Sequence, residues 1–235
     1  MPILNRLHFF GERMIIDCIS DLHGFYPELE GGDLLIVAGD LTARDTYVEY
    51  KKFFEWIYSQ KYSKKILISG NHDNFLMKTA ENSHLRRLAG YDKDDIEFEY
   101  LCDSGTEFEG LKIWGSPWTK TFEGINPKCK AFTCDTDEEL GEKWNLIPDD
   151  TDIVITHTPP YGIFDETKRK ELVGSKSLLL RIAEIKPLIH CFGHIHEQGG
   201  KQLVLLWKNG TCFINCSNVN ERYKPVNKPI RIDLQ

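Results

Sequence analysis

The stretch DLLIVAGD, residues 33–40, places a continuous apolar run directly before a glycine and a carboxylate. An apolar run without alternation is typical of a strand that is covered on both faces. In open α/β sheets, ligands bind beyond the carboxyl ends of such strands, and Gly39 would let the chain turn sharply there. Taken alone, however, a Gly-Asp pair more often only caps a turn. The rest of the chain must therefore decide what Asp40 does.

Short apolar runs bounded by turn residues predict further strands on both sides of this stretch. Together with it, the predicted strands are Met14–Ser20, Asp33–Gly39, Lys65–Gly70, Leu111–Gly115, Asp152–His157, Leu188–Gly193, Leu203–Lys208, Thr211–Cys216 and Ile230–Leu234. Strands separated by helices come early and closely spaced strands come late, which favours an α/β fold with mixed sheets. No linker or internal repeat interrupts the chain, so residues 1–235 are expected to form a single domain.

Helical spacing occurs between several of these runs. Thr46 and Glu49 form a capping box, and an apolar face at Tyr50, Phe53, Phe54 and Ile57 follows them. Further helices are predicted over Ser175–Lys186 and Glu138–Leu146. Two stretches remain without a regular pattern: Ser83–Glu99, which is ambiguous, and Gly115–Asp135, which is expected to be a long ordered loop.

The composition is that of a globular chain. Of the 235 residues, 41% are hydrophobic and 28% are charged, and the longest apolar runs are too short to span a bilayer. The first thirteen residues lack the apolar core of a signal peptide, so a cytoplasmic location without membrane association is expected. The formal net charge of −7 makes long nucleic acid a disfavoured partner, because surfaces that bind phosphate chains are usually basic.

The seven cysteines include no CxxC pair, so a structural zinc knuckle is not indicated. Several of them lie inside apolar runs, where a free cysteine behaves as a small hydrophobic residue. Reduced, buried thiols are therefore expected. Cys129 and Cys134, in the long loop, are the two whose oxidation state is open.

Polar clusters end five of the predicted strands. These clusters are Asp21-x-His23, Gly39-Asp40, Gly70-Asn71-His72-Asp73, His157 and Gly193-His194-x-His196. Each has an ordinary explanation when taken alone, such as a turn rich in Asx residues or a structural histidine. Residues two apart in an extended chain point the same way, however, so such pairs can also converge on one ion.

Their shared position changes the interpretation. Five of the eight histidines lie in these clusters, and four clusters contain a glycine or, like Asp21-x-His23 before Gly24, directly precede one. If the carboxyl ends of the strands lie together, all five clusters face one edge of the sheets. The mixture of imidazole, carboxylate and amide ligands suits manganese, iron or zinc better than calcium.

The ordered set of clusters resembles the calcineurin-like metallophosphoesterase superfamily. Softer motifs, namely Gly115-Ser-Pro-Trp118, Thr156-His-Thr-Pro-Pro160, Phe192-Gly-His-Ile-His-Glu197 and Phe213-Ile-Asn-Cys-Ser217, further resemble its metallophosphoesterase-domain-containing (MPPED-like) branch. The resemblance implies a four-layer αββα sandwich with two mixed β-sheets flanked by helices. It also implies two divalent ions, with manganese expected and iron or zinc as alternatives.

The resemblance assigns a role to each cluster. Asp21, His23, Asp40 and His196 would hold one ion, and Asp40 would bridge to a second ion held also by Asn71, His157 and His194. His72 would be the general acid beside the leaving oxygen, with Asp73 behind it to fix the tautomer of a histidine. Many relatives carry another acid at the position of Ala43, and the MPPED-like branch has a similar Gly-Asp-x-Thr form without it.

The implied function is metal-dependent phosphoester hydrolysis. A hydroxide that bridges the two ions would attack phosphorus in line. Small phosphodiesters, cyclic nucleotides among them, are the expected substrates, and a phosphomonoesterase or protein phosphatase is the alternative. The alternative outside the enzymes is a non-catalytic, metal-binding interaction scaffold. Such a protein would be expected to have lost several ligands.

Four other residues have two interpretations each. Arg44 could bind substrate phosphate, but a solvated surface arginine is the more frequent case. Trp118 and Phe122 could stack on a base, but packing of the long loop is favoured. His190 lies within the run Leu188–Phe192 and is expected to be a core histidine rather than a ligand.

Overall fold

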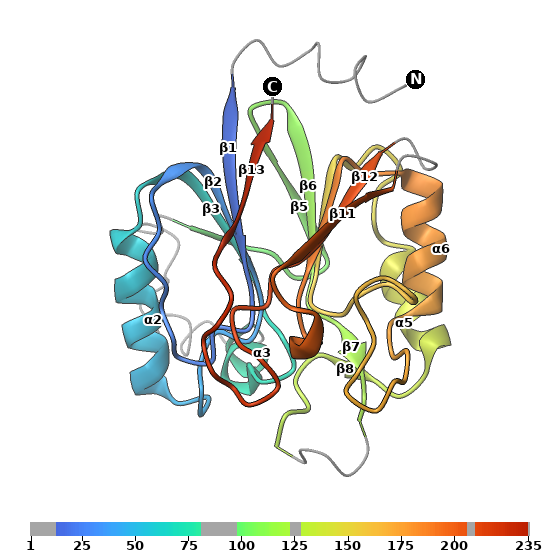
Figure 1. The fold of residues 1–235 in the computed structure, drawn as a ribbon, viewed down its shortest axis with the longest axis horizontal. Helices are drawn as coiled ribbons and strands as arrows, with labels where there is room; N and C mark the ends of the chain where they lie inside the picture. The colour runs from blue at the N-terminus through green and yellow to red at the C-terminus, as the bar shows by residue number, and fades with distance from the viewer. Residues whose placement is uncertain (1–12, 81–97, 123–127, 206–209, 235) are drawn as a thin grey trace.

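The computed structural model describes residues 13–80, 98–122, 128–205 and 210–234. Two large sheets lie face to face with helices on their outer sides (Figure 1). The first sheet has the order β13-β1-β2-β3-β4. Its strands are β1 (Met14–Ile19), β2 (Gly32–Ala38), β3 (Tyr62–Ile68), β4 (Glu99–Tyr100) and β13 (Ile230–Leu234). All neighbours are parallel except β13, which pairs antiparallel with β1, so the sheet is mixed.

The second sheet has the order β11-β12-β10-β9-β6-β5. Its strands are β5 (Ser104–Phe108), β6 (Leu111–Ser116), β9 (Ile153–Thr156), β10 (Ile189–Phe192), β11 (Lys201–Leu205) and β12 (Thr211–Asn215). The four inner strands are parallel, and the edge strands β5 and β11 are antiparallel to their neighbours. This sheet is therefore mixed as well.

Helices cover the outer face of each sheet. The first sheet packs against α2 (Tyr47–Ser59), whose buried face shares a cluster with Leu35 and Val37 of β2. The second sheet packs against α5 (Asp137–Trp144) and α6 (Lys176–Ile185). The alternate residues of β2, Leu34 and Ile36, face the core between the two sheets. Burial on both faces explains the continuous apolar runs and confirms the predicted four-layer αββα sandwich with two mixed sheets.

The helix ends follow the local sequence. The side chain of Thr46 accepts a hydrogen bond from the backbone N of Glu49, and the side chain of Glu49 accepts one from the backbone N of Thr46. The predicted capping box is therefore present. Ser175 caps α6 in a similar way. At its other end α6 stops where Lys186 adopts a left-handed conformation with φ +52°, directly before Pro187. None of the described helices is long and apolar enough to cross a bilayer.

The prediction of one long loop over Gly115–Asp135 was wrong in part. Strand β6 continues to Ser116, and two short strands, β7 (Thr119–Lys120) and β8 (Thr133–Cys134), pair parallel within the stretch. Two-residue strands carry no periodic signal, because periodicity needs several residues to show. Residues 123–127 lie outside the described residues.

Other elements also differ from the predictions. Strands β4 and β5, helix α3 (Asn74–Ala80) and the 3₁₀ turn η1 (His196–Gln198) were not predicted. Strand β5 is polar and half-exposed at a sheet edge, so it has no apolar run. Strand β11 begins at Lys201, two residues before the predicted start, and residues 206–208 of that prediction lie outside the described residues. Most of the ambiguous Ser83–Glu99 also lies outside them. That residues 1–235 form one domain stays a prediction.

Candidate metal centre

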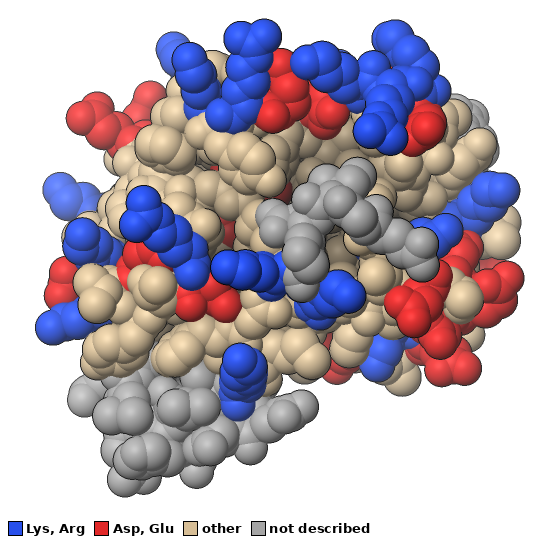
Figure 2. All heavy atoms as spheres, turned by 90° about the horizontal axis from the view of Figure 1, so that it is seen from below, with Lys and Arg blue, Asp and Glu red and all other residues tan. Residues whose placement is uncertain are grey.

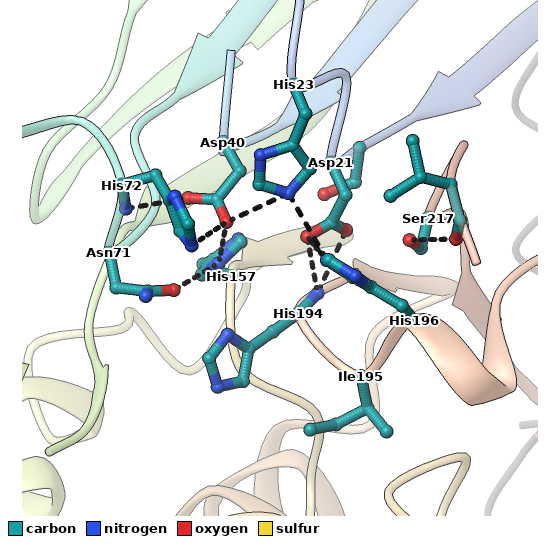
Figure 3. Close-up of polar contacts among 12 residues, drawn as sticks. Asp21, His23, Asp40, Asn71, His72, His157, His194, Ile195, His196 and Ser217 are labelled. Carbon is teal, nitrogen blue, oxygen red and sulfur yellow. Dashed lines mark hydrogen bonds and ion pairs between the residues drawn. The ribbon is translucent and has the colours of Figure 1, made fainter. Parts of the chain in front are cut away.

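All five polar clusters lie at the same edge of the two sheets. Asp21, Asp40 and Asn71 follow β1, β2 and β3 of the first sheet. His157 follows β9 and His194 follows β10, both in the second sheet. The strands within each set are parallel, so their carboxyl ends come together. Figure 3 shows the side chains pointing toward one another, with the carboxylate of Asp40 at the middle of the group.

One group of ligand atoms surrounds Asp21. Single atoms of Asp21, His23, Asp40 and His196 all lie within 4.8 Å of one another. His196 Nε2 lies 3.1 Å from Asp21 Oδ1 and 3.3 Å from His23 Nε2. His23 Nε2 in turn lies 3.6 Å from Asp40 Oδ2. These four residues could hold one metal ion, and they are the four that the family resemblance implies for the first ion.

A second group surrounds His157. Its Nε2 lies 3.1 Å from Asn71 Oδ1 and 3.4 Å from Asp40 Oδ2. Its Nδ1 lies 2.9 Å from the carbonyl oxygen of Ala38, a contact that directs Nε2 toward the other ligands. The ring of His194 lies 5.0 Å from the ring of His157, centroid to centroid. Asp40 therefore belongs to both groups, which is the position that a bridging ligand needs.

The buried carboxylates of Asp21 and Asp40 favour the binding of cations at the centre. Burial by itself would raise the pKa of Asp40, but His157 and His72 hold it well below its usual range. Burial also lowers the pKa of His157, yet Asp40 outweighs this effect and raises it to about 9. In the described chain, histidines are the only cationic side chains within 4.0 Å of Asp21 and Asp40. Two divalent ions would supply the positive charge that no lysine or arginine provides.

Two other histidines of the centre, His23 and His194, are held neutral, which suits metal binding. Burial lowers the pKa of His23 to about 4 and that of His194 to about 3. A neutral imidazole has a free lone pair, and metal ligation requires one. The donor set of imidazole nitrogens with carboxylate and amide oxygens fits manganese, iron or zinc.

The glycines of the clusters make room for the ligands. A Cβ atom built on Gly193 would overlap Asp21 Oδ2 and Ser20 Oγ, and one built on Gly70 would overlap Asp40 Oδ1. Gly39 has φ +99°, and a Cβ there would lie 2.7 Å from His157 Nδ1. Any larger residue would therefore displace a ligand. The positive φ of Gly39 agrees with the sharp turn expected there.

Several ligands themselves have an unfavourable backbone conformation. The φ angles are +51° at Asp21, +43° at His23, +55° at Asp40 and +68° at His194. Non-glycine residues adopt this left-handed region infrequently, and it persists where the surrounding structure enforces it. Backbone hydrogen bonds do so here: Asp21 N donates to Gly39 O at 2.9 Å, and His23 N donates to Asp40 O at 3.0 Å.

Asp73 does not have the contact that the sequence suggested. Its buried carboxylate accepts hydrogen bonds from the backbone of Asp40, Leu41 and Gly70 and from the hydroxyl of Tyr50. Within the described residues, no histidine ring donates to it. It therefore fixes the loops that carry the ligands. The carboxylate was expected to contact a histidine ring. It instead accepts from backbone N–H groups that follow β2 and β3.

His72 lies beside the centre, on the wall of a cavity. Its Nε2 is 3.9 Å from Asp40 Oδ2, and its backbone N donates to Asp40 Oδ1 at 2.9 Å. The atom beside its Nδ1 is the sulfur of Cys129, at 3.2 Å. The cavity has a volume of about 460 Å³ and is lined by ligands Asp40, Asn71, His194 and His196 as well as by His72.

Sequence reasoning missed three residues of this cavity. Tyr223 lies over the centre, with its ring 4.8 Å from the ring of His23 and 5.1 Å from that of His196. Lys120 and Cys129 also line the cavity. All three come from loops or very short strands, and only Cys129 had drawn attention in the sequence, for its oxidation state.

The structure distinguishes between the two interpretations that the sequence left open for four residues. The indole of Trp118 donates to Asp103 and its ring packs on Phe132, so it anchors the loop, whereas Phe122 lines the cavity. Arg44 is exposed and is not among the described residues that line the cavity. His190 is a core residue: it is fully buried, with Nε2 2.9 Å from Thr156 Oγ1.

Comparisons with known proteins agree with this geometry. The model of the family described as "Calcineurin-like phosphoesterase" matches residues 14–198. Human metallophosphoesterase domain-containing protein 1 is 36% identical, over 92% of this chain and 70% of that protein. A UPF0046 protein of Caenorhabditis elegans is 33% identical, over 96% of this chain and 82% of that protein.

Solved structures show the same fold at low sequence identity. One matches with a TM-score of 0.67 at 14% identity, over 95% of this chain and 96% of the other. The protein TT1561 of Thermus thermophilus matches with a TM-score of 0.57 at 15% identity, over 95% of this chain and 100% of the other. With the fold, the ligand geometry and the family match together, the chain belongs to the calcineurin-like phosphoesterase family.

Proposed function

We propose that this chain is a phosphodiesterase that hydrolyses small phosphodiesters, with cyclic nucleotides among the candidate substrates. One observation carries the proposal. Seven side chains of the ligand type, from five strand ends, converge at the floor of an open cavity whose wall presents His72. A scaffold that had lost its activity would have no reason to keep every one of these ligands.

The residues divide the work of hydrolysis. Two divalent ions, when bound, supply Lewis acidity and activate a water for attack on phosphorus. Asp40 would contribute to both ion positions because it belongs to both groups of candidate ligands. His72 points into the cavity and can give its proton to the leaving oxygen. Cys129, beside its Nδ1, limits how that ring can turn.

The preference for diesters rests on the room above the centre. A volume of about 460 Å³ is within the range of small-molecule sites and exceeds what a bare phosphate needs. Phe122 and Tyr223 stand on the wall and can contact an ester substituent. A phosphomonoesterase needs no second substituent, so the extra space favours the diester.

We further propose manganese as the native ion and the cytoplasm as the location. The nitrogen and oxygen ligands suit manganese, with iron and zinc as alternatives. All seven cysteines are free, including Cys191 and Cys216, whose sulfurs lie 3.3 Å apart without a bond. Free thiols so close together are in keeping with a reducing compartment.

The test is turnover by metal-stripped protein that has been reloaded with manganese, zinc or iron. The substrates are bis-p-nitrophenyl phosphate, p-nitrophenyl phosphate and a set of cyclic nucleotides. We expect the diesters to be preferred, with two equivalents of metal per chain by mass spectrometry. Preference for the monoester would replace the proposal by the phosphomonoesterase alternative. No turnover with both metals bound would leave the scaffold alternative instead.

A further inference from the structure

One wall of the cavity has a cation that the proposed hydrolysis does not use. Lys120 in β7 lines this wall together with Phe122 and Thr133. Among the described residues that line the cavity, Lys120 is the only lysine or arginine. Its ammonium group makes no ion pair with another residue of the described ranges. A permanent charge beside a phosphoester site, without a partner there, needs an explanation.

The backbone of Lys120 has a fixed position relative to the metal centre. Strand β7 pairs with β8 through Thr119 with Thr133 and Lys120 with Cys134. The preceding Thr119 is buried, and its Oγ1 lies 3.3 Å from Nε2 of the ligand His194. A two-residue strand thus contacts a ligand with one residue and presents an ammonium group with the next. Because Lys120 is exposed and lines the cavity, its flexible stem can bring the ammonium group to an anion bound there.

Charges of both signs surround this cavity. Figure 2 shows Lys and Arg side chains interspersed with Asp and Glu on this face, and the chain has a net charge of −7. Two carboxylates that also line the cavity have partners: Glu197 accepts a hydrogen bond from Lys168 N at 3.0 Å, and Glu221 lies 3.7 Å from Arg222. Lys120 is therefore the permanent cation of the described lining that can attract an anionic group.

We propose that Lys120 binds a second anionic group of the substrate, so that the preferred substrates are small phosphodiesters carrying a further phosphate beside the scissile one. This inference rests on the proposed phosphodiesterase function. The metal ions, when bound, would hold the scissile phosphate, so that group would need no lysine. An ammonium group binds a phosphate as a point charge, so Lys120 suits a second phosphate whose exact orientation varies.

A matched pair of substrates tests the assignment. Thymidine 5′-(p-nitrophenyl phosphate) and its 3′-phosphorylated form release the same p-nitrophenolate from the same diester. With the manganese-loaded wild type, we expect kcat/KM to be about tenfold higher for the 3′-phosphorylated form, the size of one charge-assisted hydrogen bond at a solvent-accessible site. Raising the salt concentration from about 0.05 to about 0.5 M should shrink this advantage, because the contact is screened.

Variants identify the residue responsible. Lys120→Met should reduce the advantage to about twofold or less and leave turnover of the simple diester within about twofold of the wild type. Lys120→Arg keeps the charge and should retain most of the advantage. Lys51→Met removes an exposed lysine of α2, away from the cavity lining, and should change neither value.

The outcomes separate this inference from the proposed function. Turnover of both diesters with equal kcat/KM, or an advantage that survives Lys120→Met, would overturn the role of Lys120 and leave the phosphodiesterase standing. No turnover of either diester by the metal-loaded wild type would overturn the phosphodiesterase proposal and this inference with it.

Discussion

Replacing Asp73 by asparagine distinguishes two roles for this carboxylate. Its Oδ2 accepts from Asp40 N at 3.0 Å and from Gly70 N at 2.8 Å. Its Oδ1 accepts from Leu41 N at 3.2 Å and from the hydroxyl of Tyr50 at 2.8 Å. The amide nitrogen of asparagine accepts no hydrogen bond. With the amide nitrogen in place of Oδ2, Asp40 N and Gly70 N would both face a donor. With it in place of Oδ1, only Leu41 N would, because the Tyr50 hydroxyl can donate to Asp45 Oδ1 instead, at 3.0 Å.

The cost follows from the number of donors left without an acceptor. Each buried donor that loses its acceptor costs about 1–3 kcal/mol, so the less costly orientation, with one such donor, lowers the free energy of unfolding by about 1–3 kcal/mol. Taking about 2 kcal/mol, and about 2–4 °C per kcal/mol for a chain of this size, the Tm of the metal-free protein should fall by roughly 4–8 °C. Metal content should fall as well, because the lost bond holds the residue next to Asp40.

The assay is calorimetry of the metal-free protein with metal analysis of the reloaded protein. Asp165→Asn is the control, since Asp165 is equally buried and accepts from Gly162 N and Gly174 N through Oδ2 alone. Asparagine can keep its oxygen there, so Tm should fall by no more than about 2–4 °C with full metal content. An Asp73→Asn variant with unchanged Tm and metal content, but slow on poor leaving groups, would refute this reasoning and show that Asp73 acts through His72.

The other predictions concern the centre itself. Asp40→Asn should lose both metal affinity and turnover, because only a carboxylate offers two oxygens to two ions; full metal content with normal turnover would contradict this role. His72→Asn should keep its metals but lose about 10²–10⁴-fold in rate, more on poor leaving groups than on activated ones; equal losses would argue against a general acid. Gly193→Ala should fold but bind less metal, since its Cβ overlaps Asp21 Oδ2, whereas stoichiometric binding would show that the loop can shift.

The strands that carry the ligands could be predicted because their burial leaves a simple signal. The run Leu34–Ala38 is apolar throughout, since alternate residues face α2 and the core between the sheets. Strand β5 escaped prediction for the opposite reason. Its residues Ser104–Phe108 alternate between half-buried and exposed at a sheet edge, and no apolar run results.

The strand-end clusters that meet at the candidate metal centre could likewise be predicted, whereas the rest of the cavity could not. Asp21 and His194 stand directly after buried strands, so their position in the sequence indicates their position in space. Tyr223, Cys129 and Lys120 reach the centre from irregular segments whose path depends on tertiary packing. The predicted contact of Asp73 with a histidine was wrong for another reason. Its neighbour in sequence, His72, suggested a contact, but the nearby donors are backbone groups of another strand end.

The centre also determines how the two sheets meet. The core between them is apolar, and its attraction is non-directional, so it does not by itself fix their relative position. Directional contacts cross from one sheet to the other at the centre: His157 Nδ1 to Ala38 O at 2.9 Å, and His194 N to Asp21 Oδ2 at 2.9 Å. Each joins a ligand loop of the second sheet to a strand end of the first. Because left-handed residues such as Asp21 and His194 cost about 1–3 kcal/mol each, the packing of both sheets must enforce them. The metal site and the sandwich are therefore one structural unit, in which a shift of either sheet would separate the two groups of ligands.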